Sequence, residues 1–437
     1  VQDSWHVGDR LTLNPGVRLD HVSGGAPGQD SVYSRTNIAP RLGFALDITG
    51  DHKTVLKGNY SQYYDGIFND IYKLATPGYE PRIGYDMSGC PRYGPSGPTA
   101  SYRCPANLRV QASVTNPPHS TIDPNIKHPR VDEVSLGVER ELGHDVRLAV
   151  TGVWRENKNF IGSVLPLARW TKTTLNTTAT PGFPSEPITV YKWANRSASQ
   201  GTLLVTNPDG FQYLDPSGNV LGTVDAHRSY KAAMFVLSKA YSHRWRGQVS
   251  YVYSKVKGTV DNSSEGTFGP SRFYETPTRS LVNSDGPLTN DRPNELKALL
   301  GVQVPVLEIA VNAYYRSISG RTYTPFQRFS SSQTSFSSYF GSSSGRQPLL
   351  EPRGSRRLPT ENILDVRLEK IFTFGARKDR LAVYADITNV FNKALITSVL
   401  TRVPSTKIAG VSTPVLFEAP GAITAPRQTV LGARWSF

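Results

Sequence analysis

The chain closes on Thr429-Val430-Leu431-Gly432-Ala433-Arg434-Trp435-Ser436-Phe437, a stretch in which apolar and polar residues alternate. One side collects Leu431, Ala433, Trp435 and Phe437, and the other collects Gly432, Arg434 and Ser436. Successive side chains of a β-strand point to opposite faces, so this period of two predicts a strand with one apolar face and one mostly polar face. The final residue of the sequence is itself aromatic.

The same alternation recurs along the whole sequence. Its clearest other example sets Leu381, Val383, Ala385 and Ile387 against Tyr384, Asp386 and Thr388. Comparable stretches lie at residues 11–19, 38–48, 133–139, 146–155, 248–254, 308–316 and 364–372. Most extend to about 9 to 12 residues, the length that a tilted strand needs to cross a bilayer, whereas soluble strands are nearer to five or six. Counting inward from Phe437 predicts about thirteen such strands.

The connections between these strands alternate between two lengths. Very short turns such as Gly143-His144, Ser242-His243 and Val304-Pro305-Val306 alternate with long polar loops. The long loops are expected near residues 21–37, 65–130, 156–223, 258–290, 319–357 and 392–424. Bacterial outer-membrane barrels have short periplasmic turns and longer extracellular loops. The sequence therefore predicts an all-β fold, a large antiparallel transmembrane β-barrel with its long loops outside the cell.

Two soluble all-β folds are the alternatives to a membrane barrel. A β-sandwich also alternates, but its strands are shorter and its loops are not sorted by length onto opposite ends. A β-propeller would repeat every 40 to 50 residues or so, and the spacing of strand pairs here varies far more. The sequence contains no run of about 18 apolar residues, which argues against a transmembrane helix.

The charge of the chain is strongly basic. Its 437 residues carry 49 Lys and Arg against 35 Asp and Glu, a formal net charge of +14. A basic chain first suggests nucleic acid as a partner. Here the Lys and Arg are scattered through strands, loops and turns, without a basic helix or a long basic run. Anionic lipid head groups or an anionic ligand fit as well, and we expect no nucleic acid.

Only two cysteines are present, Cys90 and Cys104, both in a Pro-, Gly- and Tyr-rich part of the expected 65–130 loop. Two cysteines this close in a loop suit one disulfide in an oxidising compartment, which would close a small part of that loop. Two unpaired thiols are the alternative. We expect no metal site, because neither a Cys-x-x-Cys motif nor clustered histidines accompany them.

Enzyme chemistry finds little support in the sequence. It has no Walker loop and no His-Glu-x-x-His motif. The eight histidines are dispersed, and His119 and His128 share a loop without a third ligand or an acid partner at metal-site spacing. We therefore expect no catalytic residue, cofactor or metal. An outer-membrane hydrolase is kept only as a third option, after the two functions given below.

Several phrases of the sequence resemble TonB-dependent receptors. They lie at residues 1–18, 38–45, 53–60 and 63–65, and in the closing portion, which runs from Asp386-Ile387-Thr388-Asn389-Val390-Phe391-Asn392 to the final strand. The stretch 129–140 is similar to a strand of the Oar-like subgroup of this family. The resemblance covers nearly all the predicted strands, in the same order, and fails in the long loops.

This resemblance implies a barrel of about 22 strands, a plug domain inside it, and a short segment that engages TonB. Residues 1–437 would then supply the C-terminal part of the barrel, about 13 of those strands. The plug and the TonB-contacting segment would lie upstream of Val1. The resemblance further implies the outer membrane of a Gram-negative cell. The implied partners are TonB with its inner-membrane energising complex, the barrel-assembly machinery, membrane lipid, lipopolysaccharide and an unidentified solute.

Charged residues on the polar faces of the strands are expected to line the lumen of the barrel. They are Arg18, Arg41, Arg147, Arg316, Arg367 and Glu369, together with Glu133, Glu139, Arg155, Glu308 and Asp365. Some of them could contact a plug or a passing solute. The alternative is that they simply hydrate or pair within a wet interior.

Aromatic residues are expected in two further roles. Those near strand ends fit the girdles of a membrane barrel, namely Tyr63, Tyr64, Trp154, Trp245, Tyr314, Tyr315, Trp435 and Phe437. Trp435 and the terminal Phe437 also resemble the signal that the barrel-assembly machinery reads. In the loops, the candidates for solute contact are Tyr85, Tyr93, Tyr102, Arg103, Trp193, Tyr274, Arg321 and Tyr323.

Two functions of different classes follow. The first is active transport, in which the intact protein binds a scarce extracellular solute and imports it through a plugged barrel driven by TonB. The second is a structural or adhesive surface barrel whose loops bind partners without transport. An upstream plug with a TonB-binding segment would favour the first.

Overall fold

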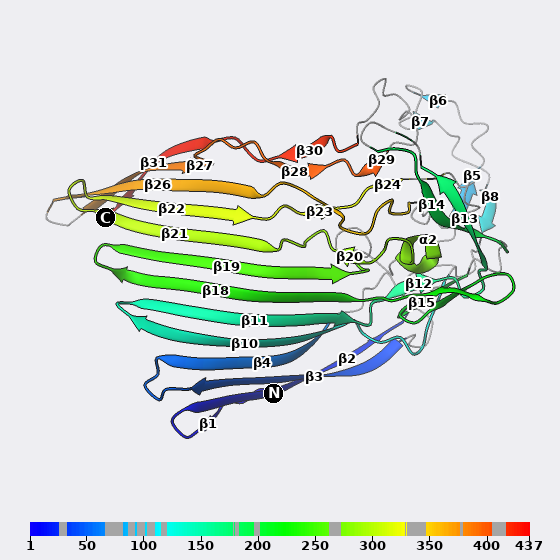
Figure 1. The fold of residues 1–437 in the computed structure, drawn as a ribbon, viewed down its shortest axis with the longest axis horizontal. Coiled ribbons are helices and arrows are strands. Elements are labelled where there is room, and N and C mark those ends of the chain that lie inside the picture. Colours follow the sequence, from blue (N-terminus) through cyan, green and yellow to red (C-terminus); the bar gives the residue numbers. More distant parts are fainter. Residues whose placement is uncertain are drawn as a thin grey trace.

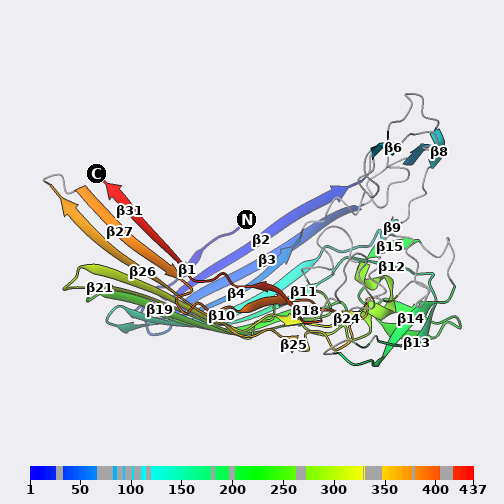
Figure 2. The same cartoon turned by 90° about the horizontal axis from the view of Figure 1, so that it is seen from above.

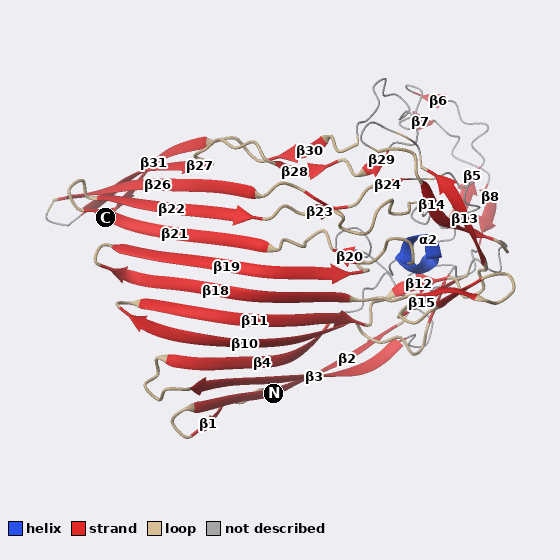
Figure 3. Cartoon of the chain, viewed as in Figure 1, coloured by secondary structure: helices blue, strands red, loops and turns tan. Residues whose placement is uncertain are grey.

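A computed structural model of the chain describes residues 1–25, 33–65, 82–85, 92–93, 101–102, 110–114, 120–177, 179, 183–195, 202–261, 272–327, 329, 347–375, 379–403 and 417–437. One antiparallel sheet dominates the fold, and thirteen strands follow one another across it (Figures 1 and 3). This confirms the all-β class and the predicted number of strands.

Apart from β1, which has three residues, the strands of this sheet are longer than those of most soluble proteins. In sheet order they are β1 (Trp5–Val7), β2 (Leu11–Gly24), β3 (Tyr33–Asp47), β4 (Thr54–Tyr64), β10 (Arg130–Gly143), β11 (Val146–Lys158), β18 (Arg228–Ser242), β19 (Trp245–Gly258), β21 (Asn294–Val304), β22 (Ile309–Ile318), β26 (Glu361–Phe374), β27 (Asp379–Thr388) and β31 (Gln428–Ser436). A short strand, β20 (Gly286–Pro287), also pairs with β19.

The register of the sheet separates an apolar face from a polar face. Residues directly opposite one another in an antiparallel pair share a face. One such row joins Val138, Val150, Phe235, Tyr251 and Leu296 across five strands. Large apolar side chains remain exposed along this face, among them Phe235 at 42% and Leu431 at 78%. The alternation in the sequence therefore becomes one continuous apolar surface.

Short turns and long connections lie at opposite ends of the sheet (Figure 1). At one end, His144 and Asp145 join β10 to β11, and His243 and Arg244 join β18 to β19, all four with positive φ. Two successive positive φ angles give the tight hairpin turn whose twist matches that of the flanking strands. At the other end, the connections span residues 65–129, 159–227, 259–293, 319–360 and 389–427.

The segment 21–37, expected to be a loop, is mostly strand. The register of β2 and β3 continues as far as the pair Gly24 and Tyr33. His21 and Thr36 lie opposite one another in it, with 3.0 Å between His21 Nδ1 and Thr36 Oγ1. Backbone pairing continues through this polar segment because it satisfies the main chain regardless of side-chain polarity.

In their described parts, the long connections contain short strands and two single helical turns. The paired strands are β5 (Arg82–Tyr85) with β8 (Val110–Val114), β6 (Arg92–Tyr93) with β7 (Ser101–Tyr102), β15 (Leu203–Thr206) with both β9 (Ser120–Ile122) and β12 (Gly162–Val164), β13 (Trp170–Asn176) with β14 (Pro187–Trp193), β16 (Gln212–Leu214) with β17 (Val220–Thr223), β23 (Thr322–Tyr323) with β25 (Arg356–Arg357), β24 (Phe326–Gln327) with β29 (Arg402–Val403), and β28 (Ile396–Val399) with β30 (Pro420–Ile423). The helical turns are η2 (Arg272–Glu275) and α2 (Pro277–Ser280).

The large sheet is curved into a trough. Figure 2 shows β31 rising on one side and β2 and β3 on the other. A cavity of about 1250 Å³ on the polar face is lined by residues from β11 through to β31, so this face is the concave one. Within the described residues, the edge strands β1 and β31 do not pair with each other. No helix in the described part of the chain is long and apolar enough to cross a membrane.

Candidate functional site

The concave face gathers the charged residues that the sequence singled out. Through the register of the strands it carries Arg18, Arg41, Glu133, Glu139, Arg147, Arg155, Arg316, Asp365, Arg367 and Glu369. Glu308 is an exception. It lies in the exposed turn 305–308 with a φ of 52°, because the hairpin after Val304 is one residue longer than expected.

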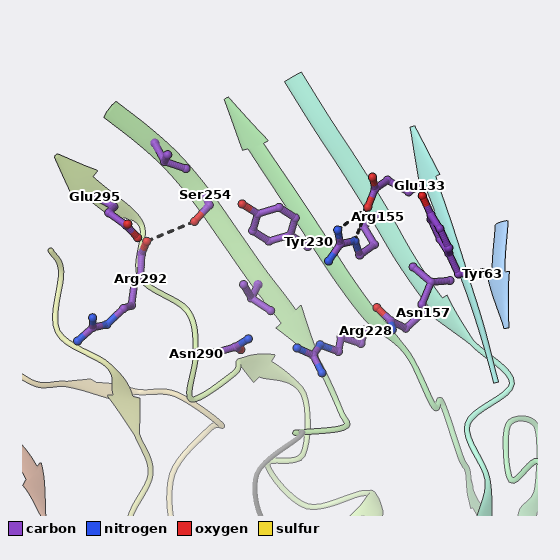
Figure 4. Close-up of a pocket in the computed structure, with 13 residues that line it drawn as sticks. Tyr63, Glu133, Arg155, Asn157, Arg228, Tyr230, Ser254, Asn290, Arg292 and Glu295 are labelled. Carbon is purple, nitrogen blue, oxygen red and sulfur yellow. Dashed lines mark hydrogen bonds and ion pairs between the residues drawn. The ribbon is translucent and has the colours of Figure 1, made fainter. Parts of the chain in front are cut away.

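A cavity of about 640 Å³ opens on this face near the long connections (Figure 4). Glu133 and Arg155 lie directly opposite one another on β10 and β11, and Arg155 Nε donates to Glu133 Oε2 at 2.7 Å. The guanidinium carbon of Arg155 lies 5.9 Å from the centre of the Tyr230 ring. Three strands thus present a charged pair and an aromatic face to one space.

The same cavity reaches the next strands and the connection between them. Arg228 and Tyr230 extend into it from β18, and Ser254 from β19 donates through Oγ to the carbonyl oxygen of Arg292 at 3.3 Å (Figure 4). The Arg292 guanidinium forms an ion pair with Glu361 at the start of β26. The lining therefore combines cations, carboxylates and neutral hydrogen-bonding groups, a mixture that suits a polar solute.

The larger cavity lies nearer the short turns and is lined by a second charge network. Arg367 donates through Nη2 to Glu369 at 2.9 Å and through Nη1 to Asp386 at 3.2 Å. Its guanidinium carbon lies 4.0 Å from the centre of the Tyr384 ring. Glu139 lies 2.9 Å from Lys57 Nζ in a separate pair on this face. Most charges of the concave face are thus already partnered, which agrees with the alternative that they pair within a wet interior.

The aromatic residues near the strand ends divide between the two faces. Tyr64, Trp154, Trp245, Tyr315 and Trp435 share the apolar face, as a membrane girdle requires. Tyr63 and Tyr314 lie on the polar face instead, and Tyr63 stacks with Arg41, whose guanidinium carbon is 5.2 Å from the ring centre. Adjacent residues of a strand cannot face the same side, so each Tyr-Tyr pair supplies one girdle residue.

Arg356 joins two of the long connections. Its guanidinium donates to Glu351 Oε1 at 2.6 Å and to Glu418 Oε1 at 2.7 Å, and Tyr323 donates to the same Glu418 oxygen at 2.6 Å. The guanidinium carbon also lies 5.1 Å from the ring centre of Phe417. We call Tyr323, Glu351, Arg356 and Glu418 the loop clamp, because they join the 319–360 connection to the 389–427 connection.

The clamp shifts the titration of its own members. The hydrogen bond from Arg356 holds the pKa of Glu351 below its ordinary value. Burial alone would raise the pKa of Glu418, but hydrogen bonds from Tyr323 and Arg356 outweigh it and leave that pKa lowered. Burial, followed by the bond to Glu418, raises the pKa of Tyr323 to about 12. At neutral pH both carboxylates are therefore charged and the phenol is neutral.

Two of the predicted loop contacts are buried in the core of the connections. Trp193 is 4% exposed and stacks on Trp170, and Tyr274 is 1% exposed. The Tyr213 hydroxyl donates to the carbonyl oxygen of Tyr274 at 2.7 Å and accepts from Ser280 Oγ at the same distance. Burial raises the pKa of Tyr213. In this arrangement, Trp193 and Tyr274 stabilise the connections and do not face solvent.

The other loop candidates have varied outcomes. Arg321 is exposed, and Tyr323 belongs to the loop clamp. The remaining positions lie outside the residues whose side chains the structure describes, namely Tyr85, Tyr93, Tyr102, Arg103, Cys90, Cys104 and His119.

His128 is buried, which lowers its pKa, and its ring lies 5.2 Å from that of Tyr33. In the described part of the chain, no three His, Cys, Asp or Glu are grouped so as to hold a metal.

Sequence reasoning missed the role of Arg356 and its two glutamates. Arg356 stands next to another arginine, Arg357, and Glu418 lies 62 positions further along the chain. No local spacing connects such distant residues. Only the packing of one connection against another brings them together.

Comparisons with known proteins agree with this architecture. The family described as "Outer membrane beta barrel domain" matches residues 23–320. The TonB-dependent transporter Oar of Myxococcus xanthus is 23% identical over 90% of this chain, which spans 35% of the length of that relative. Among solved structures, the outer membrane transporter YddB of Escherichia coli has a TM-score of 0.52 at 14% identity, over 97% of this chain and 43% of that one.

The family match covers well over half of the chain and includes nine of the thirteen strands in whole or in part. The structural likeness to the transporter supports the same sheet architecture. The chain spans less than half of either relative. The chain shows the strand pattern and the two-faced curved sheet of an outer-membrane barrel, and it is similar to the TonB-dependent transporter Oar. We conclude that it belongs to the outer membrane beta-barrel domain family and forms part of a barrel in the Gram-negative outer membrane.

Proposed function

We propose that this chain forms the C-terminal part of an active transport receptor, which binds a scarce extracellular solute and imports it with energy delivered through TonB. The observation that supports the proposal most is the concave polar face, whose cavity of about 640 Å³ opens toward the long connections. A solute entering between those connections would meet Arg155, Tyr230 and Arg292 first. The similarity to Oar, itself a TonB-dependent transporter, supports the same reading.

The barrel of this receptor needs more strands than the described sheet contains. Unpaired strand edges are not tolerated in the hydrocarbon of a membrane. We infer that β1 and β31 each pair with further strands, to a total of about 22, and that a plug occupies the lumen. Five long connections would then be extracellular, and the short turns periplasmic. Arg18, Arg41, Arg147, Arg316, Arg367 and Glu369 would face the plug or the solute path.

The test is a comparison of uptake in cells that produce the intact protein, with and without TonB. Untargeted mass spectrometry of the medium would follow which solutes disappear. We expect at least one solute to be depleted only when both the protein and TonB are present. Depletion that persists without TonB would contradict energised transport and would indicate a passive pore.

A structural or adhesive barrel is the second candidate, and one observation favours it. The connections have an apolar core of their own, built around Trp170, Trp193, Tyr213 and Tyr274. Such a core gives the outer end of the barrel a stable surface for partners. If no solute is depleted in the uptake test, but removal of residues 183–195 abolishes cell-surface attachment, the adhesive function replaces transport.

A further inference from the structure

The pairing between β3 and β4 stops well before β3 itself begins. β3 pairs with β2 as far as Tyr33, but its pairing with β4 reaches only Arg41, opposite Ser61. The next pair would join Pro40 to Gln62, and Pro40 has no backbone N–H to donate. Residues 34–40 therefore have no neighbouring strand on the β4 side, and Figure 2 shows β2 and β3 rising away from the strands that follow them. We call residues 34–40 the open edge.

The open edge presents backbone groups at every second residue. Ile48 N–H donates to the carbonyl oxygen of Thr54, so the even-numbered residues of β3 point their backbone groups toward β4. On the open edge these residues are Ser34, Thr36 and Ile38, and their N–H groups have no partner among the described residues. All three residues are exposed. An unpaired edge of this kind is a template for another strand.

The open edge lies on the long-connection side of the aromatic girdle. Leu42 shares a row of the apolar face with the girdle residue Trp154. Residues 34–40 continue β3 beyond that row, toward the long connections. There Ile38 and Leu19 lie opposite one another on the convex face and are 58% and 65% exposed. Water can satisfy free backbone groups at this level, so the edge is tolerated without a neighbour and stays accessible to one.

On the concave face, arginines flank the open edge. Arg35 donates to a backbone carbonyl oxygen of the 65–129 connection at 3.0 Å, and Arg41 stacks on Tyr63. Neither arginine forms an ion pair with an acid that the structure describes. Asp20, the acid beside them on β2, is paired with Arg18 at 2.9 Å. A strand added to the open edge would therefore meet apolar groups on one face and uncompensated positive charge on the other.

We propose that the open edge binds an extended peptide by strand addition, and that such peptides are the solutes that the receptor takes up. A polypeptide backbone supplies donors and acceptors at the repeat of the edge, about 6.8 Å for every second residue. Apolar residues of the peptide would cover Ile38 and Leu19, and acidic residues would lie near Arg41. Tyr63 also lines the cavity of about 640 Å³, so the peptide would lie at the entrance of that cavity. The substrate class rests on the transport function proposed above, whereas the binding site does not.

The test measures hydrogen exchange of single amides in the intact protein in detergent, with and without a synthetic peptide. The peptide alternates valine with glutamate and has the length of the open edge. We expect the amides of Thr36 and Ile38 to exchange freely without peptide, and to exchange about tenfold more slowly when peptide saturates the protein. The amides of Arg35 and Asn37 point toward β2, so they should be protected in both samples and serve as the internal control.

Two variants of one residue separate the backbone from the side chain. Thr36→Pro removes one N–H of the open edge and leaves the hydrogen bonds to β2 in place. Its matched control is Thr36→Val, which changes the same side chain but keeps the N–H. With a fluorescent form of the peptide, Thr36→Pro should weaken binding about tenfold, and Thr36→Val should bind as the wild type does. A peptide with lysine in place of glutamate should bind the wild type about tenfold more weakly. Protected amides at Arg35 and Asn37 in Thr36→Pro verify that this variant is folded.

Several outcomes would overturn the proposal. Slow exchange at Thr36 and Ile38 without peptide would mean that another segment of this chain, or a second copy, already occupies the edge. Free exchange with saturating peptide, or equal binding by Thr36→Pro and the wild type, would remove the docking site. Peptide binding together with TonB-dependent depletion of a different class of solute would overturn the substrate class. Peptide binding without TonB-dependent depletion of any solute would contradict transport alone, so the failures of the two proposals are distinguishable.

Discussion

Single residues on the concave face test whether its ion pairs are structural. Arg155 and Glu133 face one another across β10 and β11, and the Glu133 side chain is only 18% exposed. We expect Arg155→Ala to destabilise the protein by about 1 kcal/mol, because an unpaired and partly buried carboxylate remains. Urea unfolding of the intact protein in detergent measures this.

Arg434→Ala is the matched control for that variant. Arg434 is exposed on the same face of edge strand β31 and forms no ion pair with any described residue. Its removal should change the free energy of unfolding by less than about 0.5 kcal/mol. If both variants change the free energy of unfolding equally, the ion pair between Arg155 and Glu133 does not stabilise the protein.

The loop clamp predicts a dependence of loop order on pH. Because the pKa values of Glu351 and Glu418 are lowered by folding, their stabilisation is complete above the ordinary value of 4.5 and is lost as the pH falls through the lowered values. Spin labels at positions 360 and 422 should give a narrow distance distribution at pH 7 and a broad one near pH 3. Arg356→Gln should broaden the distribution already at pH 7, and equal widths throughout would contradict the clamp.

The pairing of Cys90 and Cys104 is a prediction of the sequence alone. We expect one disulfide, because both cysteines lie within a single loop of an oxidising compartment. Thiol labelling of the unfolded, non-reduced protein should therefore modify neither cysteine. Labelling of both would reject the disulfide, and labelling after reduction is the positive control.

At the scale of elements, the next prediction concerns the edge strand β31 and its role in assembly of the barrel. Trp435 stacks on Phe374 with 6.0 Å between ring centres, and Phe437 is fully exposed beyond the strand. Deletion of Phe437 should reduce outer-membrane insertion of the intact protein several-fold, if the assembly machinery reads that ring. Phe374→Leu is the control, because it alters an aromatic neighbour of the same edge without touching the end. Normal insertion after the deletion would contradict the terminal-signal hypothesis.

The long strands were predictable because their information is local. Alternation of period two depends on adjacent residues only, as in Leu381 to Ile387, and it also fixed which charges share the polar face. Two local errors have equally local causes. Glu308 was assigned to a strand because the turn after Val304 was taken one residue too short, and Tyr63 and Tyr314 were assigned to the girdle without regard to strand parity.

The connections were not predictable in the same way. Trp193 and Tyr274 look like exposed recognition residues when read alone, yet they meet in a shared core that joins the 159–227 and 259–293 connections. The contacts of Arg356 with Glu418, and of Tyr213 with Ser280, span 62 and 67 positions. Packing between distant segments determines such contacts, and the periodicity of the sequence does not predict that packing.

At the scale of the whole molecule, curvature turns a local alternation into two environments. The apolar face is convex and continuous, and the concave face holds the ion pairs and both polar cavities. A chain with this division can enclose a wet lumen while the surrounding lipid contacts only apolar side chains. The transport proposal and the extracellular position of the connections both depend on that division.

Nitroxide labels on neighbouring residues of one strand test this division directly. Leu237 and Ser238 are adjacent on β18 and lie on opposite faces, and Val383 and Asp386, three positions apart on β27, also lie on opposite faces. In the intact protein reconstituted in lipid, labels at Leu237 and Val383 should collide with oxygen and escape a water-soluble nickel relaxant, and labels at Ser238 and Asp386 should show the reverse. Equal access of both relaxants to all four positions, or an inverted pattern, would contradict the account.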